Sequence, residues 1–93
     1  MSNINICVIS WKSKELTAYL GNIRQISGLK VLKRRNKPFY DITGELSSQQ
    51  DYNRMIEALN NILCECGAEI EIDDDNLRDK IFAAVWFTLL NSG

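Results

Sequence analysis

Residues 47–67 read SSQQDYNRMIEALNNILCECG and carry the clearest structural signal in the chain. Large apolar side chains recur there every three or four residues, which is the period of an α-helix. They are Tyr52, Met55, Ile56, Leu59, Ile62, Leu63 and Cys66. Ser47 to Gln50 has the form of a capping box, and Gly67 is a residue type that commonly ends a helix. We therefore predict one amphipathic helix between these two signals.

The residues before this helix predict a strand, a helix and a hairpin. Asn3–Ile9 is a β-branched alternating run, typical of a strand. Ser13 offers a cap for a helix that ends at Gly28, with an apolar stripe at helical spacing. That stripe consists of Leu16, Tyr19, Leu20, Ile23 and Ile26. The runs 29–34 and 39–46 alternate around a polar turn, which indicates a hairpin, and Gly44 is a candidate bulge within it.

The residues after the helix complete the order of elements. Ala68–Ile72 alternates as a short strand, Asp73–Asp75 can cap a helix, and a last helix follows. The first six elements match the ferredoxin-like βαββαβ arrangement, with strands in the spatial order 4-1-3-2. We predict a single α+β domain over residues 1–93, a ferredoxin-like antiparallel sheet with an added C-terminal helix. Its edges would be the second and fourth strands, and charged edges discourage aggregation.

The last helix poses the main question about partners. Ile81 to Leu90 carries no charge, and a helix that is apolar all round must be covered on more than one side. It could lie on the open face of the sheet or against a second copy of the chain. We predict that Phe82, Trp86 and Leu89 lie against one surface, which Ile81, Val85 and Phe87 cannot all share. Phe82, Trp86 and Phe87 are candidate oligomer contacts.

Composition limits the class of protein. The chain has 93 residues, 45% of them hydrophobic and 25% charged, which suits one small domain. Its longest apolar run is about half of the ~20 residues that a membrane span needs. No signal peptide is recognisable at the N-terminus. We therefore expect a soluble cytoplasmic protein without membrane association.

The residue types argue against catalysis. The chain has no histidine, which removes the commonest general base and the usual zinc sets. Its three cysteines, Cys7, Cys64 and Cys66, are expected to be free structural thiols. The five glycines are scattered and form no phosphate-binding loop. We expect a non-enzymatic protein with no catalytic residue, metal site or cofactor.

Charge is distributed unevenly along the chain. Residues 1–40 carry a net charge of +7 and residues 41–93 one of −8, although the total is only −1. The basic run contains Lys30, Lys33, Arg34, Arg35 and Lys37, and the acidic run contains Glu69, Glu71, Asp73, Asp74 and Asp75, with Asp79 close behind. Such asymmetry bears on partners and not on fold. Each run could equally be a solvated edge, and the acids could be an outward strand face followed by a cap.

Two short stretches resemble known families. Phe39-Tyr40-Asp41-Ile42-Thr43-Gly44-Glu45-Leu46-Ser47 is similar to part of the small CRISPR-associated ferredoxin-fold proteins used in spacer acquisition. Those proteins carry an Asp at the end of the first strand, where this chain reads Val8-Ile9-Ser10-Trp11. The nuclease role of that family therefore does not transfer to this chain.

The second resemblance lies near the C-terminus. Glu69-Ile70-Glu71-Ile72-Asp73-Asp74-Asp75-Asn76-Leu77, continuing to Ile81 and Val85, resembles the terminal segment of bacterial immunity proteins of the colicin and contact-dependent-inhibition kind. The resemblance implies a cytoplasmic protein that binds one cognate toxin domain and blocks it. Toxin nucleases tend to be basic, so the acidic residues would form the natural contact.

Three hypotheses follow for function. The first is an immunity or inhibitor protein that meets a basic toxin domain through Glu69, Glu71, Asp73, Asp74, Asp75 and Asp79. The second is a nucleic-acid-binding or processing subunit that uses the basic hairpin, Lys30 to Lys37, beside Phe39 and Tyr40. The third is a homodimeric regulatory domain held together by the last helix.

Overall fold

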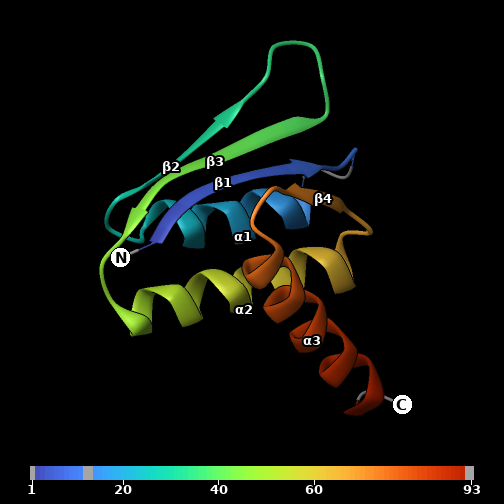
Figure 1. Ribbon diagram of the computed structural model, residues 1–93. Coiled ribbons are helices and arrows are strands. Elements are labelled where there is room, and N and C mark those ends of the chain that lie inside the picture. Colours follow the sequence, from blue (N-terminus) through green and yellow to red (C-terminus); the bar gives the residue numbers. More distant parts are fainter. Residues whose placement is uncertain (1, 12–13, 92–93) are drawn as a thin grey trace.

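The computed structural model describes residues 2–11 and 14–91. Within them the chain forms four strands and three helices, which is an α+β fold (Figure 1). In chain order these are β1 (Ser2–Ile9), α1 (Lys14–Arg24), β2 (Leu29–Lys33), β3 (Phe39–Leu46), α2 (Gln49–Glu65), β4 (Glu69–Ile72) and α3 (Asp75–Asn91). Each element predicted from the sequence is present. The predicted cap at Ser13 lies outside the described residues.

The strands form one antiparallel sheet in the order β2-β3-β1-β4. Its two edges are β2 and β4, the strands that carry the basic and acidic runs. The register places Ile6 of β1 between Ile42 of β3 and Ile72 of β4. The next residue, Cys7, lies between two acids on those strands. Because neighbouring residues of a strand point to opposite faces, the sheet has one apolar face and one mixed face.

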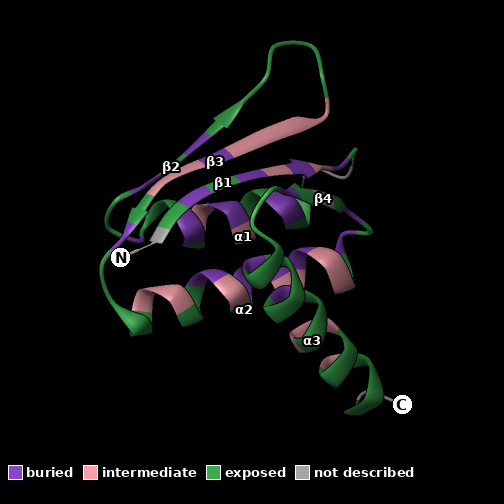
Figure 2. Ribbon diagram, viewed as in Figure 1, coloured by how far each residue is buried: buried purple, intermediate pink, exposed green. Residues whose placement is uncertain are grey.

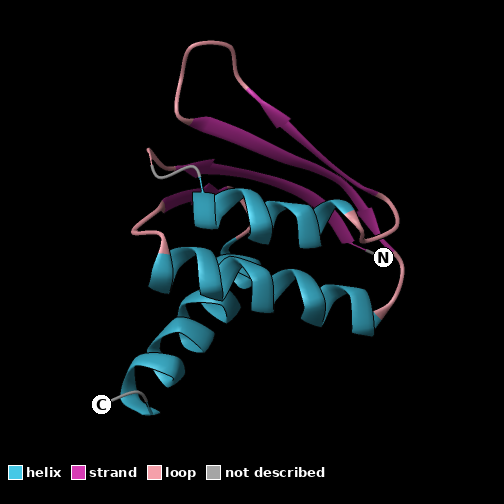
Figure 3. Ribbon diagram, turned by 180° about the vertical axis from the view of Figure 1, so that it is seen from behind, coloured by secondary structure: helices cyan, strands magenta, loops and turns pink. Residues whose placement is uncertain are grey.

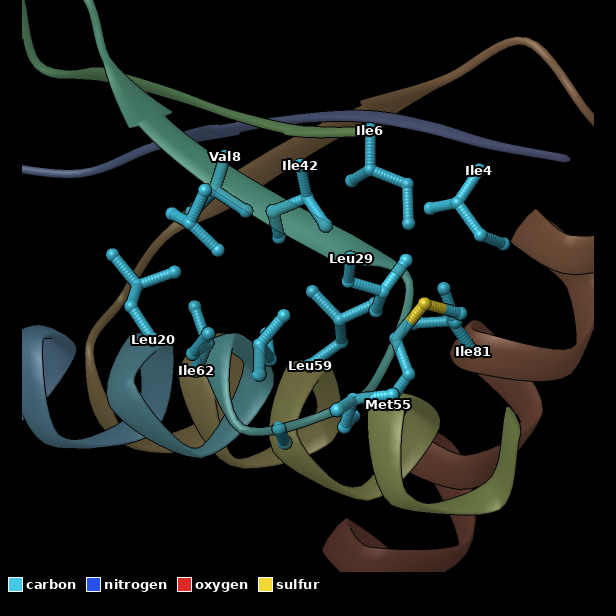
Figure 4. Packing of buried hydrophobic residues seen from close by; sticks show 14 of the residues in the cluster. Ile4, Ile6, Val8, Leu20, Leu29, Ile42, Met55, Leu59, Ile62 and Ile81 are labelled. Carbon is cyan, nitrogen blue, oxygen red and sulfur yellow. The ribbon is translucent and has the colours of Figure 1, made fainter. Parts of the chain in front are cut away.

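Helices α1 and α2 cover the apolar face and leave the mixed face open (Figures 1 and 3). Figure 4 shows Ile6 and Ile42 pointing from the sheet toward Leu59 and Ile62 of α2. The core consists of Ile4, Ile6, Val8, Leu16, Leu20, Ile23, Ile26, Leu29, Val31, Ile42, Leu46, Met55, Ala58, Leu59, Ile62, Cys66, Ala68, Ile72, Leu77 and Ile81. The apolar stripes predicted for α1 and α2 therefore supply most of the helical side of the core.

Helix α2 begins one residue later than its sequence signal suggested. Its cap is Ser48, whose backbone is extended and whose Oγ accepts a hydrogen bond from the Asp51 N–H at 3.1 Å. The prediction that the capping box starts at Ser47 is therefore wrong by one residue. An extended residue with a side-chain oxygen directed at the third following N–H is what defines a cap, and Ser48 meets both conditions. At the other end, Gly67 has the left-handed φ of 61° that favours glycine.

Gly44 does not mark a bulge. The pairing of β1 with β3 runs without interruption past the partners Ile4 and Gly44. A Cβ atom at Gly44 would collide with the carbonyl oxygen of Gly28, and the φ of Gly44 is +143°. Glycine is needed there because two backbone segments approach too closely for any side chain.

Helix α3 lies on the helical side of the sheet and not on its open face (Figures 1 and 3). Its most extensive contacts are with α2 and β4, and its C-terminal turns extend away from the sheet. Ile81 is fully buried beside Met55 in the core (Figure 4). The opposite side is exposed, so the prediction that Phe82, Trp86 and Leu89 lie against one surface is wrong within the single chain.

The physical reason lies in what the two available surfaces offer. The open face of the sheet carries charged side chains, whereas α2 offers partly buried apolar residues, among them Tyr52, Ile56 and Leu63. Packing the Ile81 side of α3 against an apolar neighbour removes hydrocarbon from water without desolvating a charge. Only one side of α3 can make that contact, so the residues on the other side stay exposed.

Candidate protein-binding surfaces

The six predicted partner-binding acids lie along the β4 edge and the start of α3. We call them the acidic edge: Glu69, Glu71, Asp73, Asp74, Asp75 and Asp79. All six are exposed. Glu69 lies opposite Ile9 and Glu71 opposite Cys7, so both project on the open face of the sheet. Among the described residues β4 pairs as a strand only with β1, so its outer side is an edge that another strand could join.

Two members of the acidic edge make contacts within the fold. Asp74 Oδ1 accepts a hydrogen bond from the Leu77 N–H at 3.2 Å and so caps α3. Asp75 forms an exposed ion pair with Arg78, with an N–O distance of 2.9 Å. Glu69, Glu71, Asp73 and Asp79 form no ion pair within residues 2–11 and 14–91. These four carboxylates are therefore the part of the acidic edge that a partner could use.

The predicted basic run, Lys30, Lys33, Arg34, Arg35 and Lys37, lies on the β2–β3 hairpin, which projects beyond the rest of the sheet (Figure 1). Arg34 is not free, because its Nε and Nη2 donate to the Asp41 carboxylate at 2.8 and 2.9 Å. The Arg34 hydrogen bonds hold the pKa of Asp41 below its usual range. The guanidinium also lies 5.1 Å from the centre of the Phe39 ring.

The remaining basic residues do not form one surface. Lys33 lies 6.0 Å from the Tyr40 ring, and the alternation of β2 directs Lys30 to the opposite side of the strand from Lys33. Arg35 and Lys37 are exposed in the turn. The structure thus gathers these residues on one hairpin but divides them between its two faces and neutralises Arg34.

The centre of the open sheet face holds Cys7, partly buried beside Asp41 and Glu71. Burial raises the pKa of the Cys7 thiol, and the neighbouring carboxylates and a hydrogen bond to Asp41 raise it further, whereas Arg34 acts against them. The nucleophilic thiolate form is therefore disfavoured at Cys7. Across the described part of the chain, no three His, Cys, Asp or Glu side chains are placed to hold a metal ion.

Much of α3 is exposed (Figure 2), and five of its exposed residues are large and apolar. The exposed fraction is 47% for Phe82, 65% for Trp86, 68% for Phe87, 55% for Leu89 and 64% for Leu90. The three candidate oligomer contacts, Phe82, Trp86 and Phe87, are thus all accessible. Phe87 follows Trp86 by one residue, about 100° around the helix, so it flanks the others rather than sharing their face.

A polar network that the sequence did not reveal joins α3 to α2. Asn60 Nδ2 donates to Thr88 Oγ1 at 2.9 Å, and that hydroxyl donates to the Ala84 carbonyl at 3.0 Å. The Cys64 thiol donates in turn to Asn60 Oδ1 at 3.4 Å. Asn60 and Thr88 interrupt apolar patterns, and in the sequence such residues look like ordinary surface positions. The only signal was that each is a polar residue next to large apolar ones.

Two open hollows of the described surface border members of the acidic edge. One open hollow of about 330 Å³ lies between the first turns of α2 and α3, lined by Ser48, Tyr52, Asp74 and Lys80 among others. Another, of about 320 Å³, lies beside Ile9, Trp11 and Glu69. Both are open to solvent, and the second is also lined by Ser10 and Cys66.

None of the helices described is long and apolar enough to span a lipid bilayer. Comparison of the chain with protein-family models, with curated proteins and with solved structures finds no match.

Proposed function

We propose that this chain is a non-enzymatic binding protein of the bacterial cytoplasm that inhibits a basic protein, such as a toxin nuclease domain, through its acidic edge. One observation carries the proposal. Glu69, Glu71, Asp73 and Asp79 are exposed and unpaired among the described residues, on and just after an edge strand. The resemblance of residues 69–85 to bacterial immunity proteins points to the same residues.

The position of the glutamates on an edge strand adds a possible strand pairing to the charge attraction. A partner that approaches β4 could pair with its outer side while Lys or Arg side chains reach the two glutamates. Unpaired carboxylates speed the encounter with a basic surface and discriminate against acidic partners. The opposite edge carries the basic hairpin about three strand spacings, or ~14 Å, away, which would orient a partner of mixed charge.

We also propose that the fold belongs to the ferredoxin-like class with an added helix. The strand order counted from the acidic edge, β4-β1-β3-β2, supports this assignment, as do the two helices on one face of the sheet. The fold supports no particular function by itself, because the same architecture serves many unrelated activities.

The test is a binding measurement against the product of the adjacent gene, which for immunity proteins encodes the toxin. The informative variant is Glu69→Gln with Glu71→Gln, which removes two charges without changing side-chain size. Its matched control is Glu57→Gln with Glu65→Gln, which removes two exposed charges from α2. We expect association with the partner to slow by roughly tenfold at low salt for the first variant and to change little for the control.

Two results would remove the proposal. One is a neighbouring product that does not bind. The other is binding that is equally sensitive to both glutamine pairs, since that would reflect net charge and not the β4 edge. Binding to a labelled oligonucleotide that weakens steeply with salt would instead favour the basic hairpin, because phosphate contacts release counterions.

A further inference from the structure

Four large apolar side chains form one outward face on α3. Phe82, Trp86, Leu89 and Leu90 follow the spacing i, i+4, i+7 and i+8, which places them on one side of a helix. Each is 47% or more exposed. The buried residues Leu77 and Ile81 occupy the side that packs on the rest of the chain. We call the four exposed residues the outer face of α3.

We propose that the outer face of α3 pairs with the outer face of a second copy of this chain, with the two helices antiparallel and Trp86 at the two-fold axis. None of the four residues of the outer face belongs to the acidic edge. The proposal therefore stands or falls separately from the proposed function.

The absence of charge on the outer face favours a second copy of the chain as its partner. No residue from Ile81 to Leu90 is charged, so the outer face gives neither a basic nor an acidic protein a complementary group. A helix that binds a lipid surface typically has Lys or Arg along its flanks. Here Asp73 and Asp74 precede the helix and Asp75 begins it, and anionic headgroups would repel all three. The basic residues of α3 are already engaged within the chain, Arg78 with Asp75 and Lys80 with the Tyr52 ring. An identical uncharged face meets no such penalty.

The area of the outer face suits a reversible dimer. Large apolar side chains offer about 150–250 Å² each, so four of them at the observed exposure present on the order of 450 Å² per chain. Pairing two such faces buries close to the ~1,000 Å² at which specific interfaces begin. We therefore expect dissociation in the micromolar range rather than an obligate dimer.

The acidic start of α3 decides the direction of pairing. Asp75 precedes Trp86 by eleven residues, or about 16 Å of helix. In an antiparallel pair centred on Trp86 the two Asp75 residues lie roughly 33 Å apart, whereas in a parallel pair they lie within roughly 10 Å. Physiological salt weakens repulsion with a decay length of about 8 Å, so the acidic segments repel appreciably in the parallel pair and hardly at all in the antiparallel one.

The first experiment is sedimentation equilibrium of the full chain over a range of concentrations. Trp86→Glu places a charge at the axis on a residue that is already exposed, so the monomer should fold normally, which circular dichroism checks. Trp11→Glu is the matched control, because Trp11 is 85% exposed and lies outside α3. We expect wild type and Trp11→Glu to dimerise with the same dissociation constant. For Trp86→Glu we expect a dissociation constant that is higher by roughly tenfold or more.

The second experiment fixes the direction by disulfide cross-linking in a background with Cys7→Ser and Cys64→Ser. In the antiparallel pair Phe82 of one chain is level with Leu90 of the other, and the two Phe82 residues are about 12 Å apart along the axis. A mixture of Phe82→Cys and Leu90→Cys should therefore cross-link, whereas each alone should not, since a disulfide needs Cα atoms within ~7 Å. A wild-type chain that stays monomeric, a Trp86→Glu variant that dimerises like wild type, or efficient self-cross-linking of Phe82→Cys would each overturn the proposal.

Discussion

Helices α2 and α3 are each seventeen residues long and use their apolar residues in different ways. In α2 the fully buried side chains Met55, Leu59 and Ile62 lie on one side and polar residues on the other. In α3 only Leu77 and Ile81 are buried, while Phe82, Trp86 and three other large apolar residues are exposed.

The difference shows which apolar side chains are buried within the single chain and which are not. The stripe of α2 is explained by the core beneath it. On the outer face of α3, Phe82, Trp86 and Leu90 are exposed in the single chain, and exposing such apolar surface to water is unfavourable. In the proposed dimer, a second copy of the chain covers this surface.

The sharpest contrast comes from one substitution made in both helices. Leu59→Ala removes a side chain with no exposed surface and should destabilise the protein by about 2–5 kcal/mol. Leu90→Ala removes one that is 64% exposed and should change the stability of the monomer by no more than about 0.5 kcal/mol. Urea unfolding at a low protein concentration measures both. Similar losses for the two variants would mean that Leu90 is buried in the monomer.

The polar link between the two helices gives a smaller effect. Thr88→Val leaves the partly buried Asn60 amide without its partner and should cost about 1–2 kcal/mol. Asn60→Ala and the double variant complete a mutant cycle with an expected coupling of about 0.5–1.5 kcal/mol. Additive losses in the cycle would show that α3 is not held to α2 at this point.

At their N-termini the two helices should behave alike. Ser48→Ala and Asp74→Ala each remove a capping oxygen, with an expected loss of about 1 kcal/mol in thermal or urea unfolding. Ser47→Ala is the control for α2 and should have almost no effect. A larger loss of stability for Ser47→Ala than for Ser48→Ala would show that Ser47 is the cap, as the sequence suggested.

The smallest effect concerns pH at the contact between α2 and α3. The Lys80 ammonium lies 5.2 Å from the centre of the Tyr52 ring. Burial raises the pKa of Tyr52, and the nearby Asp74 carboxylate raises it further by a smaller amount. A raised pKa in the folded state contributes stability that is complete below about pH 10 and is lost as pH rises through the folded-state value. Urea midpoints should therefore fall more steeply above about pH 10 in wild type than in Tyr52→Phe. Equal slopes would show that Tyr52 ionises as readily in the folded state as in the unfolded one.

Periodicity predicted the elements of this fold because six of them separate polar from apolar residues. It located the stripe of α2 and the alternation of β1 and β3, and with them most of the core. It could not orient α3, since a segment without a charge from Ile81 to Leu90 has no polar side to point at solvent. Burial of Ile81 rather than Trp86 depends on the surface of α2, which only the folded chain presents.

The sequence predicted which residues make up the candidate surfaces, but not which of them form hydrogen bonds or ion pairs within the chain. The acidic run could be read from the sequence, but which of three consecutive aspartates caps α3 depends on backbone geometry and proved to be Asp74. The pairing of Arg34 with Asp41 joins two strands whose register was unknown. That register is what removes Arg34 from the predicted nucleic-acid surface.

The most direct test of the account is the fluorescence of Trp86 as a function of protein concentration. The chain has two tryptophans, so Trp11→Phe leaves Trp86 as the only one. From concentrations well below the dissociation constant to well above it, its emission should shift to shorter wavelength as the exposed ring enters an apolar interface. The same titration with Leu89→Glu added should show no shift. Emission of Trp86 that stays that of a solvent-exposed indole at every concentration would contradict the claim that the outer face of α3 is an interface.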